Sequence, residues 1–220
     1  GFWKNLQNVV INIIDKGWIP MALQTEKLLD MDATAVKEAI QNGEISATDA
    51  VNTYIEHIEK VNGMLNAFVQ NRFEEARKEA ALVDEKIKRG EISGKLLGVP
   101  ITIKDSFDIK GMTTTGGIPH LKDATASEDA EVVKRLKKEG AIFLGKTNTP
   151  VLCFCQETDN KLYGRTNNPW NLSRTAGGSS GGEGSLLAAG GAAVGIGSDI
   201  GGSIRFPSHF NGIVGFKSGN

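Results

Sequence analysis

The chain has 220 residues, of which 40% are hydrophobic and 23% are charged, with 27 glycines and only 2 cysteines. This composition excludes collagen-like, coiled-coil, disordered and disulfide-scaffold proteins, and the length suffices for a buried core. The formal net charge of −1 and the aromatic content of 6% give no sign of a nucleic-acid partner. We therefore expect a globular protein of one domain or at most two.

The first predicted element is an amphipathic helix at the N-terminus. Apolar residues recur with helical spacing over residues 2–14, and Trp3 and Trp18 bracket the segment. Docking on the rest of the protein, or on a second copy in a homodimer, is the favoured interpretation, because the polar face has few basic residues. Peripheral membrane contact through residues 2–19 is the alternative. We treat residues 1–24 as this helix and its connector.

Three further helices are predicted before residue 90. A short helix is expected over residues 34–41. Ser46 resembles the first residue of a capping box, for a helix that Asn62-Gly63 would end. A charge-rich helix is expected over residues 72–89, and the side chains on its inner face are expected to be Ala80, Ala81, Leu82 and Ile87.

From residue 96 onward, strand-like and helix-like segments alternate. The predicted elements are a strand at 99–103, a helix at 128–139 capped by Ser127, a strand at 141–144, a polar loop at 156–178, a helix at 181–189 and a strand at 192–196. This order predicts an α/β fold, with a β-sheet core flanked by helices.

Glycine is concentrated near the C-terminal end, where 15 of the 27 glycines lie between residues 164 and 219. Glycines clustered in a segment that still has apolar runs indicate tight turns around a site. The same region contains no Gly-Lys-Ser/Thr sequence, so a phosphate-binding loop is excluded.

The first candidate site is Gly177-Gly178-Ser179-Ser180-Gly181-Gly182-Glu183, which formally contains the G-x-S-x-G pattern of a nucleophile elbow. An elbow follows a strand directly, whereas turn-forming residues precede Gly177 here. Ser180 and Glu183 have the spacing of a capping box for the following helix. Ser179 lies just before that helix, where the positive end of the helix dipole can activate a hydroxyl.

The second candidate is the segment from Gly195 to Arg205. A strand that runs into Ile-Gly-Gly-Ser leaves successive backbone N–H groups unpaired, which is what an oxyanion hole requires. Ser203 would be an exposed hydroxyl beside these donors, but it needs a base. His209 lies nearby in the sequence without an obvious partner.

The third candidate is Lys104, at the end of the apolar strand 99–103. Partial burial there would lower its pKa and leave an amine able to accept a proton. From the spacing alone, an ion pair with Asp105 or an exposed position on an edge strand is the favoured explanation of this lysine.

Three segments together resemble the amidase signature family, and the resemblance extends from about Met31 to the C-terminus. The residues after the serine pair and Arg205-Phe206-Pro207 are most similar to the branch that contains fatty acid amide hydrolases and related bacterial amidases. The three segments are Gly98-Val99-Pro100-Ile101-Thr102-Ile103-Lys104-Asp105, residues 177–183 and residues 195–215.

The resemblance implies a mixed β-sheet core and hydrolysis of a small-molecule amide through an acyl-enzyme, without metal or cofactor. Ser203 would be the nucleophile, Ser179 a bridging serine after a cis peptide bond, and Lys104 the base. The backbone N–H groups of residues 200–203 would form the oxyanion hole. The residues implicated are Lys104, Ser179 and Ser203 in catalysis, Ile200, Gly201, Gly202 and Ser203 in the oxyanion hole, and Ser180, Asp199 and Arg205 in support.

The resemblance also bears on partners. Family members are considerably longer, so residues 25–220 would be the N-terminal catalytic part, and a C-terminal remainder or a second chain would complete it. An alternative is an amidotransferase-type subunit that supplies ammonia to a partner enzyme. The two cysteines, Cys153 and Cys155, are too close for an unstrained disulfide. We expect them to be reduced, in a cytoplasmic protein.

Overall fold

The computed structural model describes residues 27–219. The amphipathic helix predicted over residues 2–14 lies outside this range, and so does the predicted boundary between residues 24 and 25. The described elements are α3 (Ala33–Gln41), α4 (Ala47–Leu65), β1 (Phe68–Asn71), α5 (Phe73–Lys88), β2 (Pro100–Lys104), the short 3-10 helix η1 (Pro119–Leu121), α6 (Glu131–Lys138), β3 (Ile142–Thr147), η2 (Val151–Cys153), β4 (Asn167–Asn168), β5 (Asn171–Thr175), α7 (Gly181–Ala188), β6 (Val194–Ile196) and α8 (Arg205–Asn211).

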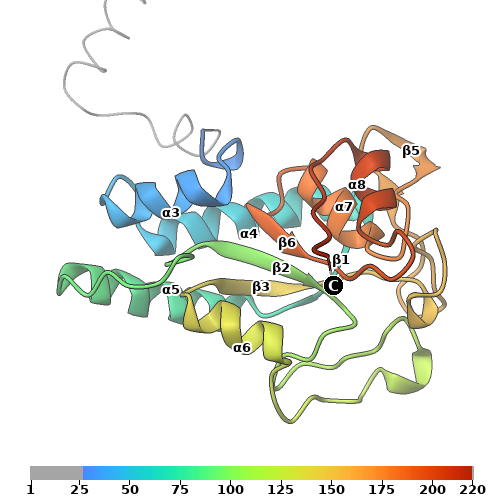
Figure 1. The fold of residues 1–220 in the computed structure, drawn as a ribbon, viewed down its shortest axis with the longest axis horizontal. Coiled ribbons are helices and arrows are strands. Elements are labelled where there is room, and N and C mark those ends of the chain that lie inside the picture. Colours follow the sequence, from blue (N-terminus) through green and yellow to red (C-terminus); the bar gives the residue numbers. More distant parts are fainter. Residues whose placement is uncertain (1–26, 220) are drawn as a thin grey trace, which may run out of the picture.

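A four-stranded sheet with the order β1-β3-β2-β6 forms the centre of the molecule. β2 is parallel to both of its neighbours, whereas β1 is antiparallel to β3. Figure 1 shows α4 and α7 on one side of the strands and α6 on the other. The predicted α/β fold, with a mixed sheet flanked by helices, is confirmed.

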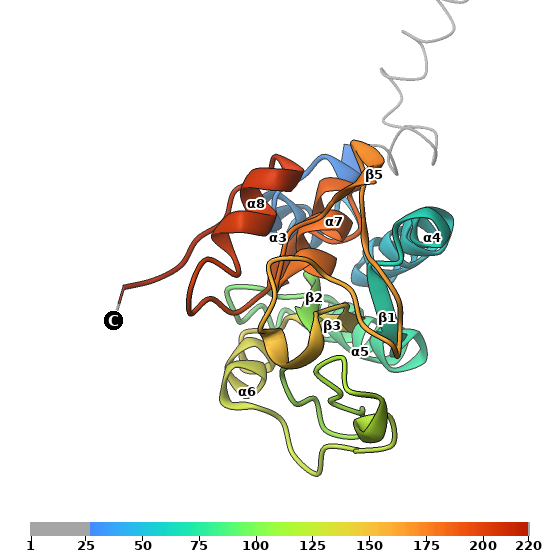
Figure 2. The same ribbon diagram turned by 90° about the vertical axis from the view of Figure 1, so that its right-hand side faces the viewer.

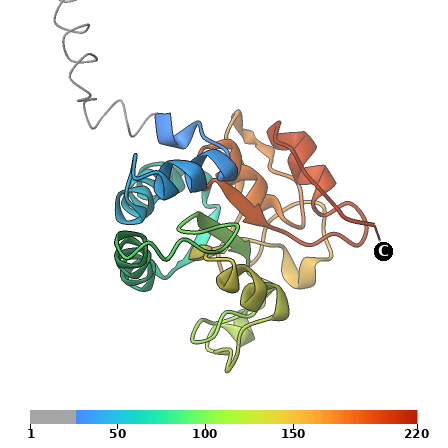
Figure 3. The ribbon, with the colours of Figure 1, turned by 60° about the vertical axis from the view of Figure 1, so that its left-hand side comes forward.

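The core forms because the apolar runs of the sequence have the periods of the elements that carry them. Every residue of β2 and β3 is buried, as expected for strands covered on both faces. Val51, Tyr54, Ile55 and Ile58 recur at helical spacing and form the buried face of α4. Figure 3 shows α4 and α5 side by side at one end of this core.

The end of α4 differs from the prediction. Ser46 caps the helix as expected, since its hydroxyl accepts from the N–H of Asp49 at 2.9 Å. The helix then continues through Asn62-Gly63 and ends at Asn66, which has a left-handed φ of 48°. The Asn62 side chain accepts from two later backbone N–H groups, so it stabilises the connection to β1 rather than ending the helix.

Two other local predictions are wrong. Ala81 and Leu82 face solvent on α5, whereas Ala80 is buried as expected and shares the inner face with Ala76 and Val83. α6 begins at Glu131, without a Ser127 cap. Asp129 accepts from the N–H of Lys110 and pairs with Lys137, and this interaction organises the loop before the helix.

The predicted polar loop 156–178 contains a short hairpin of β4 and β5. Its strands carry mostly polar residues, which gave no alternating signal in the sequence. After the hairpin, α7 packs against β2, β3 and β6 and also contacts α8. Figure 2 shows α7 and α8 together at this side of the molecule, with the chain after α8 running outward.

Candidate active site

The Lys104 side chain lies at the carboxyl end of β2 and is fully buried. Its Nζ donates to Ser179 Oγ at 2.6 Å and to Ser198 Oγ at 3.0 Å. β2 and β6 are parallel neighbours, so the segment after β6 begins at the same edge of the sheet. The topology therefore brings a lysine and two serines together from three distant parts of the sequence.

Ser179 occupies the tight connection before α7. The peptide bond between Gly178 and Ser179 is cis, as in the family that the sequence resembles. A side chain at Gly178 would overlap the backbone of Cys155 and Gln156, so this close approach requires glycine. The Ser179 carbonyl accepts from Thr149 Oγ1 at 2.9 Å, which ties the connection to the end of β3.

Burial lowers the pKa of the Lys104 amine, because the charged form loses its solvation. The nearby Cys153, Glu183 and Asp199 oppose this effect. A lysine in such an environment is neutral at a lower pH than a lysine in water. It can therefore act as a base.

Asp105 does not pair with Lys104 but lies 3.4 Å from Nζ of Lys146, and both of these side chains are buried. Thr115 and Gln70 also donate to the Asp105 carboxylate. Burial raises the pKa of Asp105 and lowers that of Lys146, and their mutual attraction opposes both shifts. The two neighbours Lys104 and Asp105 thus belong to separate polar groups on opposite sides of the strand.

The turn that carries Ser203 is organised around the Asp199 carboxylate. Asp199 accepts from the backbone N–H groups of Gly202 at 2.7 Å, Ile204 at 3.0 Å and Arg205 at 3.2 Å. The Arg205 guanidinium makes two further bonds to the same carboxylate. These interactions hold the pKa of Asp199 well below its usual range, with the Arg205 bonds as the largest cause.

The same turn determines which backbone donors are free. The Gly202 N–H is bound to Asp199, so it is not available as one of the expected oxyanion donors. Within residues 27–219, the N–H groups of Ile200, Gly201 and Ser203 have no protein acceptor, and the Ile200 side chain is fully exposed. Within the described residues, no hydrogen bond links Ser203 Oγ to Ser179 Oγ. The turn is instead joined to the serine pair through its backbone, since the Ser203 carbonyl accepts from the Ser180 N–H at 3.1 Å.

Comparison with known proteins identifies the family. The family model described as Amidase matches residues 49–219, which is more than half of the chain. The chain belongs to the amidase family. The lysine and the two glycine-serine segments described above all lie within the matched region.

Three relatives serve for comparison with this chain. It is 48% identical to fatty-acid amide hydrolase 2-B of Danio rerio, over 88% of this chain and 38% of that protein. It is 41% identical to one of the glutamyl-tRNA(Gln) amidotransferase subunits of Alkaliphilus metalliredigens, over 87% of this chain and 39% of that protein. The solved structure of a fatty acid amide hydrolase aligns with a TM-score of 0.82 and 30% identity, over 90% of this chain and 35% of that one. The chain thus spans about two fifths of the length of its curated relatives.

The predicted capping box at the start of α7 is wrong. Ser180 makes no side-chain cap bond, and its Oγ instead contacts the backbone of Ser198, at 3.3 Å from both N and O. Glu183 points into the sheet, where Thr102 and Thr147 donate to its carboxylate. Both side chains therefore connect α7 to the strands rather than satisfy the helix end.

The sequence analysis gave no role in the site to Ser198 or Thr149, and it assigned Glu183 to a helix cap. Only the position of Glu183 could have been inferred from the sequence. Thr102 and Lys104 are two residues apart on a strand, so they point to the same face and imply a polar partner opposite that face. Contacts of Ser198 and Thr149 depend on the loops after β6 and β3, whose course has no sequence period.

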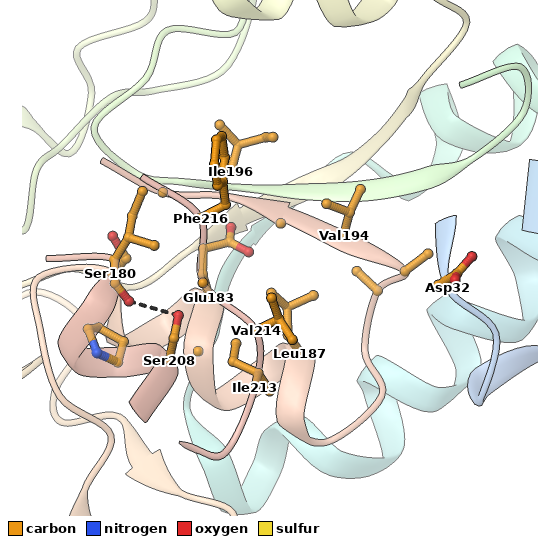
Figure 4. Close-up of a pocket in the computed structure, with 18 of the residues that line it drawn as sticks. Asp32, Ser180, Glu183, Leu187, Val194, Ile196, Ser208, Ile213, Val214 and Phe216 are labelled. Carbon is orange, nitrogen blue, oxygen red and sulfur yellow. Dashed lines mark hydrogen bonds between the residues drawn. The ribbon is translucent and has the colours of Figure 1, made fainter. Parts of the chain in front are cut away.

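A hollow of about 610 Å³ lies beside this site, between β6, α7 and the chain after α8. Figure 4 shows Ser180, Glu183, Leu187, Ile196 and Phe216 around it. Between residues 27 and 219, no cluster of three metal-ligating side chains is present. No helix in this range has the length and apolarity needed to cross a membrane.

Proposed function

We propose that the protein containing this chain is an amidase that cleaves a carboxamide C–N bond through an acyl-enzyme on Ser203. The contact of 2.6 Å between Lys104 Nζ and Ser179 Oγ is the observation that carries the proposal. It links a buried amine of lowered pKa to a hydroxyl beside the Ser203 turn. The family membership supports the same reaction class.

In the proposed first step, Ser203 Oγ attacks the carbonyl carbon of the amide. Its proton passes to Ser179 as the Ser179 proton passes to neutral Lys104. The carbonyl oxygen becomes an oxyanion, for which the N–H groups of Ile200, Gly201 and Ser203 are donors, since they have no acceptor among residues 27–219. The Lys104 proton then returns through Ser179 to the leaving nitrogen as the C–N bond breaks. Water hydrolyses the resulting ester and regenerates Ser203.

The experiment that tests this proposal is labelling with a fluorophosphonate probe, whose phosphorus is attacked by an activated serine as fluoride leaves. We expect wild type to be labelled and Ser203→Ala not to be. Ser173→Ala, on the exposed hairpin strand β5, is the matched control and should label like wild type. Labelling of Ser203→Ala at the wild-type rate would overturn the nucleophile assignment.

We further propose that a C-terminal remainder or a second chain covers the β6 side of the sheet. β6 is the last strand in the sheet order, and Val214 and Phe216 beside it are 97% and 81% exposed. We expect a chain extended by the natural sequence after Asn220 to label faster than residues 1–220 alone. Equal rates would contradict this part of the proposal.

An amidotransferase-type subunit is the alternative, and one curated relative carries that description. The higher identity to a fatty-acid amide hydrolase favours the free amidase. Purification from the native source distinguishes the two. Stable co-purification with other subunits would favour the amidotransferase.

A further inference from the structure

The Glu183 carboxylate is buried on the inner face of α7 and has two specific partners. Thr102 Oγ1 donates to Oε2 at 2.8 Å, and Thr147 Oγ1 donates to Oε1 at 2.8 Å. A Cβ at Gly195 on β6 would overlap Oε2, so the strand backbone closes the remaining side. The carboxyl group is therefore held in one position by three strands of the sheet.

This position is next to Lys104. Thr102 lies two residues before Lys104 on β2, so the two side chains share one face of the strand. Thr147 is the register partner of Lys104 on β3. Glu183 thus accepts from two neighbours of Lys104. One is Thr102, on the same strand, and the other is Thr147, opposite Lys104 on β3.

The two charges are coupled. Burial raises the pKa of Glu183 to about 7, while its two threonine bonds and the Lys104 charge lower it. In turn, Glu183 opposes the lowering of the Lys104 pKa. An ionised Glu183 stabilises the ammonium form of Lys104, and a neutral Glu183 leaves the amine free to accept a proton.

We propose that Glu183 is a positioning residue that sets the pH at which Lys104 becomes an effective base. The inference rests on the proposed function, in which Lys104 deprotonates Ser203 through Ser179. The Glu183 side chain makes its hydrogen bonds to Thr102 and Thr147, and within residues 27–219 it makes none to either serine. It acts on the reaction only through the charge and placement of the lysine.

Other titratable groups face this pair from the surrounding elements. Cys153 in η2 and Asp199 after β6 act on Lys104. Asp30 and Asp32, before α3, line the same hollow as Glu183. Figure 4 shows Asp32 and Glu183 there. His57 of α4 contacts the carbonyl of Ala189, at the far end of α7. All of these groups remain in the variants below, so a change between variants reports Glu183.

The test is the pH dependence of the second-order rate of fluorophosphonate labelling, measured on the protein with its natural sequence after Asn220. Glu183→Gln keeps the shape of the side chain and removes its charge. We expect the acid limb of its profile to move to lower pH by about one unit, because an opposite charge nearby favours the ammonium form. Glu79→Gln is the control. It removes the charge of a glutamate on α5 that pairs with Arg72, and it should not shift the acid limb.

A purely structural role of Glu183 predicts a different result. The rate would then fall by the same factor at every pH, with the acid limb unmoved, and this outcome would overturn the inference. Absence of labelling in wild type would instead refute the proposed function. The two failures are therefore distinguishable.

Thr102→Val and Thr147→Val test the same idea if Glu183→Gln does not fold. Each variant removes one hydroxyl that stabilises the ionised carboxylate, and this raises the pKa of Glu183. Glu183 is then ionised less often, so it stabilises the ammonium form of Lys104 less. We expect smaller shifts of the acid limb in the same direction. An unmoved limb in both threonine variants would also overturn the inference.

Discussion

Lys104 Nζ lies 2.6 Å from Ser179 Oγ although 75 positions separate the two residues in the sequence. Lys104 is the last residue of a central strand, and Ser179 closes the connection that leads into α7. α7 packs across the same strand, so the contact is fixed by the packing of one helix on the sheet. The packing of this helix on the sheet therefore positions the Lys104–Ser179 part of the proposed proton path.

The first prediction concerns the base itself. Lys104→Ala should lower the rate of fluorophosphonate labelling by about 10²- to 10⁴-fold, the usual contribution of a positioned acid–base group. In wild type, the rate should rise with pH through the pKa of Lys104, because only the neutral amine accepts a proton. Since burial lowers this pKa, the rise should come below the pH at which a lysine in water deprotonates.

Lys161→Ala, an exposed lysine in the loop before the hairpin, is the control for that experiment and should leave the rate unchanged. Labelling of Lys104→Ala at the wild-type rate near neutral pH would contradict the assignment of the base.

The two adjacent serines before α7 should differ sharply. Ser179→Ala removes the group that contacts Lys104, and we expect a loss of labelling of at least about 100-fold. Ser180→Ala removes only two contacts of 3.3 Å to the Ser198 backbone, and we expect a loss below about tenfold. The labelling rates of the two purified variants provide the comparison, and equal losses would argue against a bridging role of Ser179.

Much of the framework could be predicted from the sequence, because it depends on local patterns. The apolar runs at 99–103 and 141–144 overlap β2 and β3, and the predicted helix at 181–189 matches α7 to within one residue. Lys104 could be placed at a strand end for the same reason. Buried strands and their ends have clear signals in composition and spacing.

The polar connections could not be predicted, because they depend on long-range geometry. Glu183 had the spacing of a capping residue, yet two threonines on separate strands bind it instead. Gly202 was expected to offer a free N–H, but Asp199 accepts from it. In both cases a buried carboxylate could accept from several different donors. The folded structure determines which donors lie within hydrogen-bond distance, and the sequence does not show this.

The next prediction concerns Asp199, which organises the Ser203 turn. An asparagine at this position is uncharged and can no longer accept from all of its present donors, so Asp199→Asn should lower the free energy of unfolding by about 1–3 kcal/mol. Urea unfolding of variant and wild type gives this difference. Arg205→Lys, which keeps the charge but loses the paired bonds, should have a smaller effect.

The pH dependence of that difference follows from the sign of the shift. The folded-state pKa of Asp199 is depressed, so its contribution is complete above the unfolded value of about 3.9 and is lost as the pH falls through the folded value. The difference between Asp199→Asn and wild type should therefore be constant between about pH 5 and 8. A difference that already shrinks at pH 6 would contradict the assigned interactions.

The last prediction compares two glycines in helices. A Cβ at Gly182, in the first turn of α7, would overlap the backbone of Asn148 and the carbonyl of Ala67. Because a backbone contact has little room to yield, Gly182→Ala should destabilise the protein by about 1–3 kcal/mol. Gly63 is exposed in α4 with open space around it, so Gly63→Ala should stabilise by about 0.5–1 kcal/mol through the higher helix propensity of alanine.

Urea unfolding of the two alanine variants measures both effects on one scale. The Gly182 result tests how closely α7 approaches the end of β3, where the Gly182 N–H donates to the Asn148 carbonyl at 3.2 Å. That approach also sets the position of Ser179, three residues earlier, against Lys104. A Gly182→Ala variant as stable as wild type would place α7 farther from the sheet, and it would therefore also weaken the case for direct contact between Ser179 and Lys104.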